Sequence, residues 1–279
     1  MKADCHIHAV LDGVDWKQAI ARHTDKADEA FVRNILSAYR QRGFTYLRDG
    51  GDRWGAGLLA RQIAPSYGIT YRTPGPPLCF AGHYGGFIGC TYKNIQEYTD
   101  FVVSFREKGY DFIKIMISGL MDFNQFGVLT EPPLEREHIR QLIHIAHQEG
   151  MAVMAHANGQ AALFAAEAGV DSVEHGAYLQ EETLYAMGEA KTVWVPTLST
   201  IGNLRGKGRF HEPTVEKILE NALENVSLFA RIGGLLAPGT DAGAWAVPHG
   251  SETELPLLYQ AGVTEEQLQQ GIRVIIEKF

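Results

Sequence analysis

The sequence predicts an α/β protein built as a (β/α)8 TIM barrel. Short runs rich in β-branched and aromatic residues alternate with longer segments whose apolar residues recur at helical spacing, which is typical of a parallel sheet. The 279 residues are close to the roughly 250 residues of one such barrel. No GxGxxG sequence follows the first expected strand, which disfavours an open dinucleotide-binding sheet.

Eight short segments have the composition and length of buried strands. In chain order they are Ala3–His8, Phe44–Leu47, Ile69–Arg72, Phe112–Ile117, Ala152–Ala155, Ser172–Glu174, Val193–Val195 and Gly234–Ala237. Helices are expected between or after them at Ala27–Arg42, Ala56–Ala64, Ile95–Lys108, Glu135–Glu149, Gly159–Glu167, Glu181–Glu189, Pro213–Ile232 and Glu252–Ala261. A last helix is expected over Thr264–Phe279, behind a Thr264 cap.

Glycine residues mark the joints between helices and strands. Gly43, Gly109, Gly150 and Gly169 each come just before a new strand, where glycine accepts the left-handed conformation that closes a helix. The loops after strands one, three, seven and eight are long and rich in glycine. A barrel builds its active site from these loops, so we expect one barrel domain over residues 1–279 with its site at the carboxyl ends of the strands.

The composition excludes several classes of partner. The formal net charge is −8 and no segment concentrates lysine and arginine, so we expect no nucleic-acid partner. No run of about 18 apolar residues predicts a membrane span, and the amino terminus lacks the apolar run of a secretion signal. Three widely spaced cysteines argue against a disulfide framework. We expect a cytoplasmic protein that acts on a small-molecule substrate.

Polar residues occur where five of the expected strands end. Two histidines share one face of the first strand because strand side chains alternate, and a lysine interrupts the apolar run DFIKIMISG. A lone buried histidine is more often a hydrogen-bonded core residue, but two on one face leave ring nitrogens that a metal ion can satisfy. In a closed barrel all of these residues converge on one mouth. They are His6, His8, Lys114, His156, His175 and Asp241.

The ligand chemistry of this set fits zinc or a similar divalent ion. Lys114 needs a separate explanation because an ammonium group would repel metal cations. Burial and nearby positive charge favour the neutral amine, which reacts with carbon dioxide to give a carbamate. Carboxylated Lys114 would then be an anionic oxygen ligand.

These residues and their flanking motifs resemble the binuclear-metal amidohydrolase superfamily, in its imidazolonepropionase-like and Xaa-Pro dipeptidase-like branch. HIH, FIKIM, MAHANG, VEHGAY and PGTDAG occur in the order of that family over nearly the whole chain, with YLRDGG and VPTLST between them. Any one of these motifs is unspecific, whereas their order along the chain is specific.

The resemblance implies a set of roles. His6, His8 and Asp241 would hold the more buried of two divalent metal ions. The histidines that end strands five and six would hold the other, with carboxylated Lys114 as the bridge. We favour zinc, although iron and manganese accept the same ligands. A hydroxide between the ions would attack the scissile carbonyl carbon, and Asp241 would carry its proton to the leaving amine.

Other polar residues are candidates for contact with the substrate. In the related branch, the positions of His83 in AGHYGG and of Tyr178 face the substrate, and each would hydrogen-bond its carbonyl or carboxylate. A loop histidine and a packing tyrosine are the alternative interpretations. A basic, glycine-hinged loop after strand seven, with Arg205, Lys207 and Arg209, could cap an anionic substrate, although a solvated flexible loop is the better interpretation.

The remaining histidines fall mostly on predicted helices. We expect these to be surface residues, whereas His249 either lines the pocket or serves a turn. Those expected at the surface are His23, His138, His144, His147 and His211.

The favoured function is metal-dependent hydrolysis of a C–N bond in a dipeptide, N-acyl amino acid or cyclic amide. The alternative is the same site acting on esters, lactones or phosphotriesters. A mononuclear deaminase ranks lower because MAHANG offers no glutamate as proton shuttle. A non-catalytic ligand-binding barrel also ranks lower, because all six candidate ligands are present.

Many superfamily members carry an accessory β-sandwich domain. The segments before the first strand and after the last helix are too short to build one here, so we expect a bare barrel. Either the Thr264–Phe279 helix or a second subunit of a homo-oligomer would then supply the missing cover.

Overall fold

The structure is a computed structural model that describes residues 1–279, and it is an α/β protein with parallel sheets. One sheet has three strands in the order β1-β2-β3, and the other has seven in the order β10-β9-β8-β7-β6-β4-β5. Every strand pairing is parallel. The strands are β1 (Ala3–Ile7), β2 (Tyr46–Asp49), β3 (Thr70–Arg72), β4 (Leu78–Phe80), β5 (Cys90–Tyr92), β6 (Ile113–Met116), β7 (Val153–Ala157), β8 (Ser172–His175), β9 (Val193–Val195) and β10 (Leu235–Leu236).

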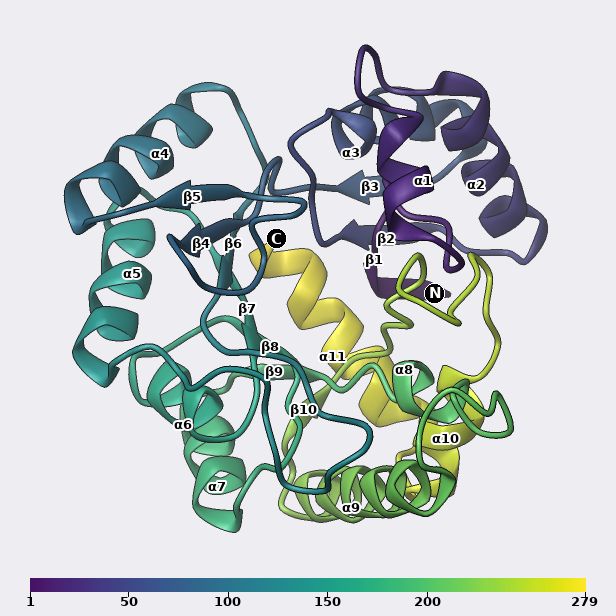
Figure 1. The fold of residues 1–279 in the computed structure, drawn as a ribbon, viewed down its shortest axis with the longest axis vertical. Helices are drawn as coiled ribbons and strands as arrows, with labels where there is room; N and C mark the ends of the chain where they lie inside the picture. The colour runs from purple at the N-terminus through teal and green to yellow at the C-terminus, as the bar shows by residue number, and fades with distance from the viewer.

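Helices form an outer ring around the strands, and one helix crosses the middle of the ring (Figure 1). The central helix is α11 (Glu265–Lys278). The others are α1 (Trp16–Ala21), α2 (Glu29–Gln41), α3 (Ala56–Ile63), α4 (Ile95–Glu107), α5 (Arg136–Gln148), α6 (Gln160–Glu167), α7 (Glu181–Glu189), α8 (Ser199–Gly202), α9 (Glu212–Arg231) and α10 (Glu254–Gln260), with a 3-10 turn over Ala64–Tyr67. No helix combines the length and the hydrophobicity needed to cross a membrane.

Backbone hydrogen bonds also join the two sheets. The Cys5 amide donates to the Pro238 carbonyl at 2.8 Å, so β1 lies beside the segment that follows β10. The Asp111 amide donates to the Thr73 carbonyl at 3.1 Å, which connects the residue after β3 to the segment before β6.

The predicted strands agree with the observed ones to within two residues at each end, and correspond to β1, β2, β3 and β6 to β10. Strands β4 and β5 lie where the sequence predicts a long loop. Each has three residues, and prolines and glycines surround them, so neither shows the alternating pattern that identifies a strand. The short helices α1 and α8 also lie in predicted loops.

The glycine joints behave as the sequence predicts. Gly43, Gly109, Gly150 and Gly169 all have left-handed φ, between +67° and +80°. A side chain at these positions would be strained, which explains glycine at each of the four helix ends.

Helix α11 covers the amino-terminal ends of the strands. A capping box of Thr264 and Gln267 starts it, as the sequence predicts. Ile272, Ile275 and Phe279 then pack in one buried cluster with residues at the beginnings of β1, β2 and β9. One of the two predicted sources of cover, the carboxyl-terminal helix, therefore occupies this end.

His23 is not a surface residue, contrary to the sequence-based prediction. Its side chain is buried, with 1% of the residue exposed. The ring accepts a hydrogen bond from the Asp28 amide at 3.0 Å and contacts Phe31 edge-on. The chain between α1 and α2 folds back on itself here, and the histidine closes that turn.

Candidate metal centre

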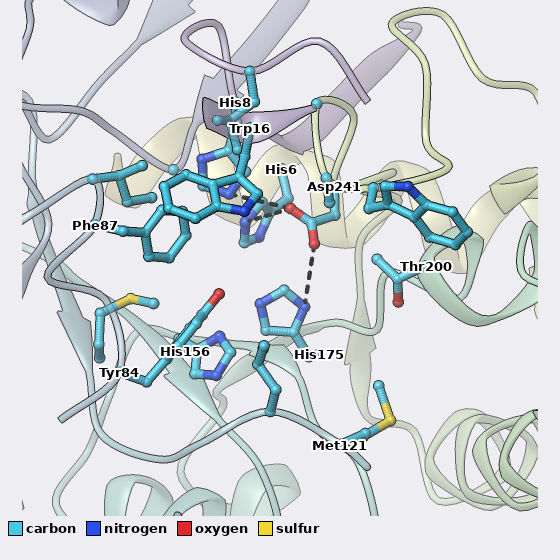
Figure 2. Close-up of a pocket in the computed structure, with 18 of the residues that line it drawn as sticks. His6, His8, Trp16, Tyr84, Phe87, Met121, His156, His175, Thr200 and Asp241 are labelled. Atoms are coloured by element: carbon cyan, nitrogen blue, oxygen red, sulfur yellow. Dashed lines mark ion pairs between the residues drawn. The ribbon is translucent and has the colours of Figure 1, made fainter. Parts of the chain in front are cut away.

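All six predicted metal ligands line one cavity of about 440 Å³ at the carboxyl ends of the strands. Four of them, the histidines, lie in the last part of a strand or directly after it, whereas Lys114 is the second residue of β6 and Asp241 follows the end of β10 by five residues. Figure 2 shows the histidines and Asp241 facing a common space. The six residues are His6, His8, Lys114, His156, His175 and Asp241.

His6, His8 and Asp241 form the tightest group. One ligand atom from each lies within 4.8 Å of the others. The Asp241 Oδ1 atom is 3.2 Å from His8 Nε2 and 3.5 Å from His6 Nε2. The Asp241 amide also donates to the His6 carbonyl at 2.8 Å, so the backbone holds the two ligands side by side.

His156 and His175 lie on the other side of the same space. Their ring centroids are 4.6 Å apart, and the His175 ring is 5.0 Å from that of His6. The His175 Nδ1 atom is 4.0 Å from Asp241 Oδ2. The two groups of ligands are therefore neighbours, with Asp241 between them, as the dashed lines in Figure 2 show.

Several ligand atoms in this cavity are buried without a hydrogen-bond partner. They are His6 Nε2, His8 Nδ1, Lys114 Nζ and Asp241 Oδ1. Unsatisfied buried polar groups cost about 1–3 kcal/mol each, and clusters of them are rare in folded proteins. Divalent metal ions satisfy imidazole nitrogens and carboxylate oxygens, so this donor set fits them.

Burial sets the protonation states of the histidines. It lowers the pKa of His6 to about 4 and that of His156 to about 3, and it holds the pKa of His175 well below the ordinary value. The charge of Lys114 acts in the same direction at all three. Near neutral pH these rings carry no charge, which is the form that binds metals.

The Lys114 amine is also affected by its surroundings. Burial lowers the pKa of its ammonium group to about 8, although Glu174 and Asp241 oppose this shift. Only 2% of Lys114 is exposed. The neutral amine is therefore accessible at a pH only slightly above neutrality.

Asp241 remains ionised. Burial by itself would raise its pKa, but the adjacent His8 ring and the fields of His6 and Lys114 outweigh burial and lower it. The residue has φ of +57°, and His175 has φ of +68°, so two of the six candidate ligands adopt the left-handed region that favours glycine. Such strain concentrates at functional sites.

A buried ion pair beneath the cavity orients His6. The His6 Nδ1 atom is 2.6 Å from Glu174 Oε2, and Arg48 Nη2 donates to Glu174 Oε1 at 2.8 Å. The side chains of His6, Glu174 and Arg48 are wholly buried. The hydrogen bond at Nδ1 leaves His6 Nε2 free to face the cavity. Sequence reasoning missed this pair, although charged residues inside the strand motifs YLRD and SVEH are an available signal.

The two predicted substrate-facing residues do not line the cavity. His83 points to Glu131, with its Nδ1 atom 3.6 Å from Oε2, and the next residue, Tyr84, lines the cavity in its place. Tyr178 lines a smaller neighbouring pocket and packs edge-on against Phe126. His249 hydrogen-bonds the Leu11 carbonyl at 2.9 Å, which fits a turn role.

The upper wall of the cavity is apolar. Thirteen of its 24 lining residues are hydrophobic. Helix α1 and loops from different parts of the chain contribute large side chains, among them Trp16, Phe87, Phe123, Phe210 and Trp245. The guanidinium of Arg209 lies 4.1 Å from the centre of the Trp245 ring and completes this wall.

Solved structures of known proteins have a similar fold. A Xaa-Pro dipeptidase with bound methionine in its active site superposes with a TM-score of 0.78 at 20% identity, covering 99% of this chain and 75% of that chain. Ochratoxinase from Aspergillus niger superposes with a TM-score of 0.75 at 22% identity, covering 98% of this chain and 68% of that chain. The chain has the fold of these two proteins. The predicted resemblance to the Xaa-Pro dipeptidase-like branch agrees with this likeness in fold and with the sequence relationship to ochratoxinase.

Sequence comparison gives weaker relationships. Ochratoxinase from Aspergillus niger is 24% identical over 285 residues, which cover 85% of this chain and 56% of the relative. An uncharacterized protein from Mycobacterium tuberculosis is 30% identical over 151 residues, which cover 51% of this chain and 40% of the relative. This chain thus spans about half the length of the curated relatives it matches. No family model matches the sequence.

Proposed function

We propose that this protein is a metal-dependent hydrolase that cleaves the C–N bond of an amide in a small substrate. The observation that carries the proposal is the convergence of six metal-binding side chains, four of them with unsatisfied buried atoms, at the base of one cavity. The likeness to proteins named as a dipeptidase and an ochratoxinase supports this reaction class.

His6, His8 and Asp241 would hold one divalent ion, and His156 and His175 would hold the other. The uncharged imidazoles and the ionised carboxylate suit zinc, which remains our preferred metal. Such ions, when bound, lower the pKa of water to about 7 and polarise a carbonyl group.

Lys114 would join the two halves of the site as its carbamate. The ammonium first loses one proton to solvent. The neutral amine then attacks the carbon of carbon dioxide, an N–C bond forms as one C=O π pair moves onto oxygen, and a second proton leaves the nitrogen, so that overall a cation becomes an anion with the release of two protons. A lysine with a pKa lowered to about 8 is suited to this step. The carbamate would give the positively charged ions an oxygen ligand from strand β6.

Asp241 would move the proton. Its carboxylate lies between the two ligand groups, and it stays ionised before the reaction because neighbouring positive groups lower its pKa. It would accept a proton from the attacking water and deliver that proton to the leaving amine nitrogen.

The cavity favours a substrate with an apolar body and one anionic group. Aromatic side chains line the part of the cavity away from the six candidate ligands. Apart from Lys114, Arg209 is the one lysine or arginine among the lining residues. An N-acyl amino acid or dipeptide with a large apolar group fits this distribution, because its carboxylate can reach Arg209 while its amide lies over the base.

The architecture forms part of the same proposal. We infer that the two sheets close as a (β/α)8 barrel and that residues 1–279 form one catalytic domain. Whether the domain works as a homo-oligomer is a separate question that gel filtration with light scattering answers.

The test is to measure metal content and activity together. Purified protein should contain up to two divalent ions per chain and hydrolyse members of a panel of N-acyl amino acids, dipeptides and cyclic amides. Lys114→Ala should abolish hydrolysis. Matched esters and lactones in the panel examine the alternative bond class, and full activity after complete metal removal would refute the proposal.

A further inference from the structure

Tyr84 lines the cavity where the motif AGHYGG predicts His83. It lies between β4 and β5, and its amide donates to Glu131 Oε2 at 2.8 Å. The next residue, Gly85, has φ of +113°, and a Cβ atom there would come within 2.7 Å of Met116 Cγ. These two constraints fix the backbone on both sides of the Tyr84 side chain.

The Tyr84 ring lies against one of the candidate ligands. Its centroid is 5.0 Å from that of His156 and 5.7 Å from that of Phe87. Figure 2 shows the hydroxyl oxygen at the inner end of the side chain, directed into the space that the ligands surround. The two ring contacts hold the phenol in this direction.

The Tyr84 hydroxyl is a free donor. It makes no hydrogen bond within the chain, although the Tyr39, Tyr92, Tyr98 and Tyr259 hydroxyls do. A tyrosine hydroxyl keeps its proton near neutral pH, because the ordinary pKa of a phenol is about 10. A protonated phenol in this place can donate a hydrogen bond to a bound molecule.

We propose that Tyr84 is a catalytic residue whose O–H group donates a hydrogen bond to the oxygen of the scissile carbonyl. This proposal rests on the proposed function, because it assigns a role within amide hydrolysis. As the attacking oxygen forms its bond to the carbonyl carbon, the C=O π electrons move onto the carbonyl oxygen. A donor fixed in advance stabilises that charge more than it stabilises the neutral amide.

His83 is the matched comparison. It precedes Tyr84 in the same loop, but its ring is directed to Glu131 and lies outside the cavity lining. If the loop contributed only general structure, substitution of either residue would have a similar effect. If Tyr84 is the donor, the two substitutions will differ.

The first experiment compares Tyr84→Phe with His83→Ala in the metal-loaded enzyme. Tyr84→Phe keeps the ring contacts and removes only the donor, so we expect kcat/KM for an N-acyl amino acid to fall about 100-fold. His83→Ala should change kcat/KM by less than about threefold, since the His83 ring does not reach the cavity. Metal content and Tm should match the parent protein in both variants.

The second measurement is independent of turnover. An N-phosphonyl amino acid carries a tetrahedral phosphonate in place of the amide carbon, and its oxygens imitate the charged carbonyl oxygen. We expect Tyr84→Phe to weaken binding of this analogue by the same factor as kcat/KM, because the donor is used in the tetrahedral state. The KM for the amide should change much less.

The outcomes separate the two proposals. Activity and analogue binding in Tyr84→Phe within about threefold of the parent would overturn the role of Tyr84 and leave the hydrolase intact. A loss of bound metal in Tyr84→Phe would also overturn it, since the phenol would then support the ligands. A parent protein that hydrolyses no amide on the panel would overturn the proposed function and this role together.

Discussion

Replacing Glu174 by glutamine removes the charge that lies between Arg48 and His6 without changing the size of the side chain. Burial by itself would raise the pKa of Glu174, but Arg48 and the hydrogen bond with His6 outweigh burial and lower it to about 2. Both carboxylate oxygens are used, at 2.6 Å by His6 and at 2.8 Å by Arg48. The substitution therefore perturbs protein stability and metal binding separately.

The stability effect comes from Arg48. Its guanidinium is wholly buried, so in Glu174→Gln it loses its only carboxylate partner. Breaking a buried pair from one side costs about 3–5 kcal/mol. Urea denaturation of metal-free protein should show this loss, and the double variant Arg48→Met with Glu174→Gln should recover much of it because no buried charge remains.

The metal effect comes from His6. The carboxylate fixes the tautomer of the ring and increases the basicity of Nε2, and removal of such a partner typically lowers metal affinity about 10- to 100-fold. Zinc titration against a chelating indicator should show this loss in the single variant and also in the double variant. Recovery of stability without recovery of affinity is the signature of a positioning role.

One control variant and two refuting outcomes make this result interpretable. Glu137→Gln breaks a surface pair with Arg140 and should leave stability and zinc affinity unchanged. A Glu174→Gln protein that binds zinc as tightly as the parent would refute the reasoning, since His6 would then need no carboxylate. Equal recovery of affinity and stability in the double variant would also refute it, because the metal effect would then be a consequence of instability.

The other predictions concern neighbouring parts of the site. Gly50→Ala would place a Cβ atom 2.3 Å from His8 Cε1, so we expect elemental analysis to show one metal ion or less per chain. In the control Gly86→Ala the new Cβ atom would come no closer than 3.5 Å to its nearest neighbour, and this variant should keep the metal content of the parent protein. Arg209→Met should lower kcat/KM for an N-acyl amino acid about 10- to 100-fold and leave kcat/KM for the uncharged carboxamide analogue unchanged. The control Arg205→Met loses only the pair with Glu216 and should change kcat/KM for neither substrate. Equal effects of Arg209→Met on the two substrates would refute carboxylate recognition. The free energy of unfolding should fall as the pH drops below about 6.5. The buried imidazoles of His6 and His156 have folded-state pKa values of about 4 and about 3, so between these values and about 6.5 they bind protons only in the unfolded chain. Urea titrations of metal-free protein that gave equal stabilities at about pH 7 and about pH 4.5 would contradict this.

The sequence could predict the ligand set because it depends on regular structure. Period-two alternation puts His6 and His8 on one face, and the succession of strands and helices brings the carboxyl ends of all strands to one rim. Residues from distant parts of the chain, such as Lys114 and Asp241, then meet without any knowledge of loops. The structure places all six candidate ligands around one cavity, and their role as ligands stays a prediction.

The features that escaped prediction depend on contacts between elements. Glu174 pairs with Arg48 across the interior, from β8 to β2, and no periodic pattern within either strand identifies that partner. The choice between His83 and Tyr84 depends on β4 and β5, whose pairing turns the connecting loop. Such short strands have no pattern of their own, so the direction of a loop side chain could not be derived from the sequence.

Two residues of strand β1, Asp4 and His6, take part in buried hydrogen bonds that support the candidate centre. Beneath His6 lies Glu174, and beneath Asp241 lies a second buried carboxylate, Asp4, which accepts hydrogen bonds from the Thr240 amide at 2.9 Å and the Thr240 hydroxyl at 2.6 Å. Asp241 needs that support, because a left-handed aspartate costs about 1–3 kcal/mol and persists only when its neighbours fix it. Glu174 therefore holds the His6 imidazole in position, and Asp4, through Thr240, holds the Asp241 carboxylate in position, before any metal ion binds.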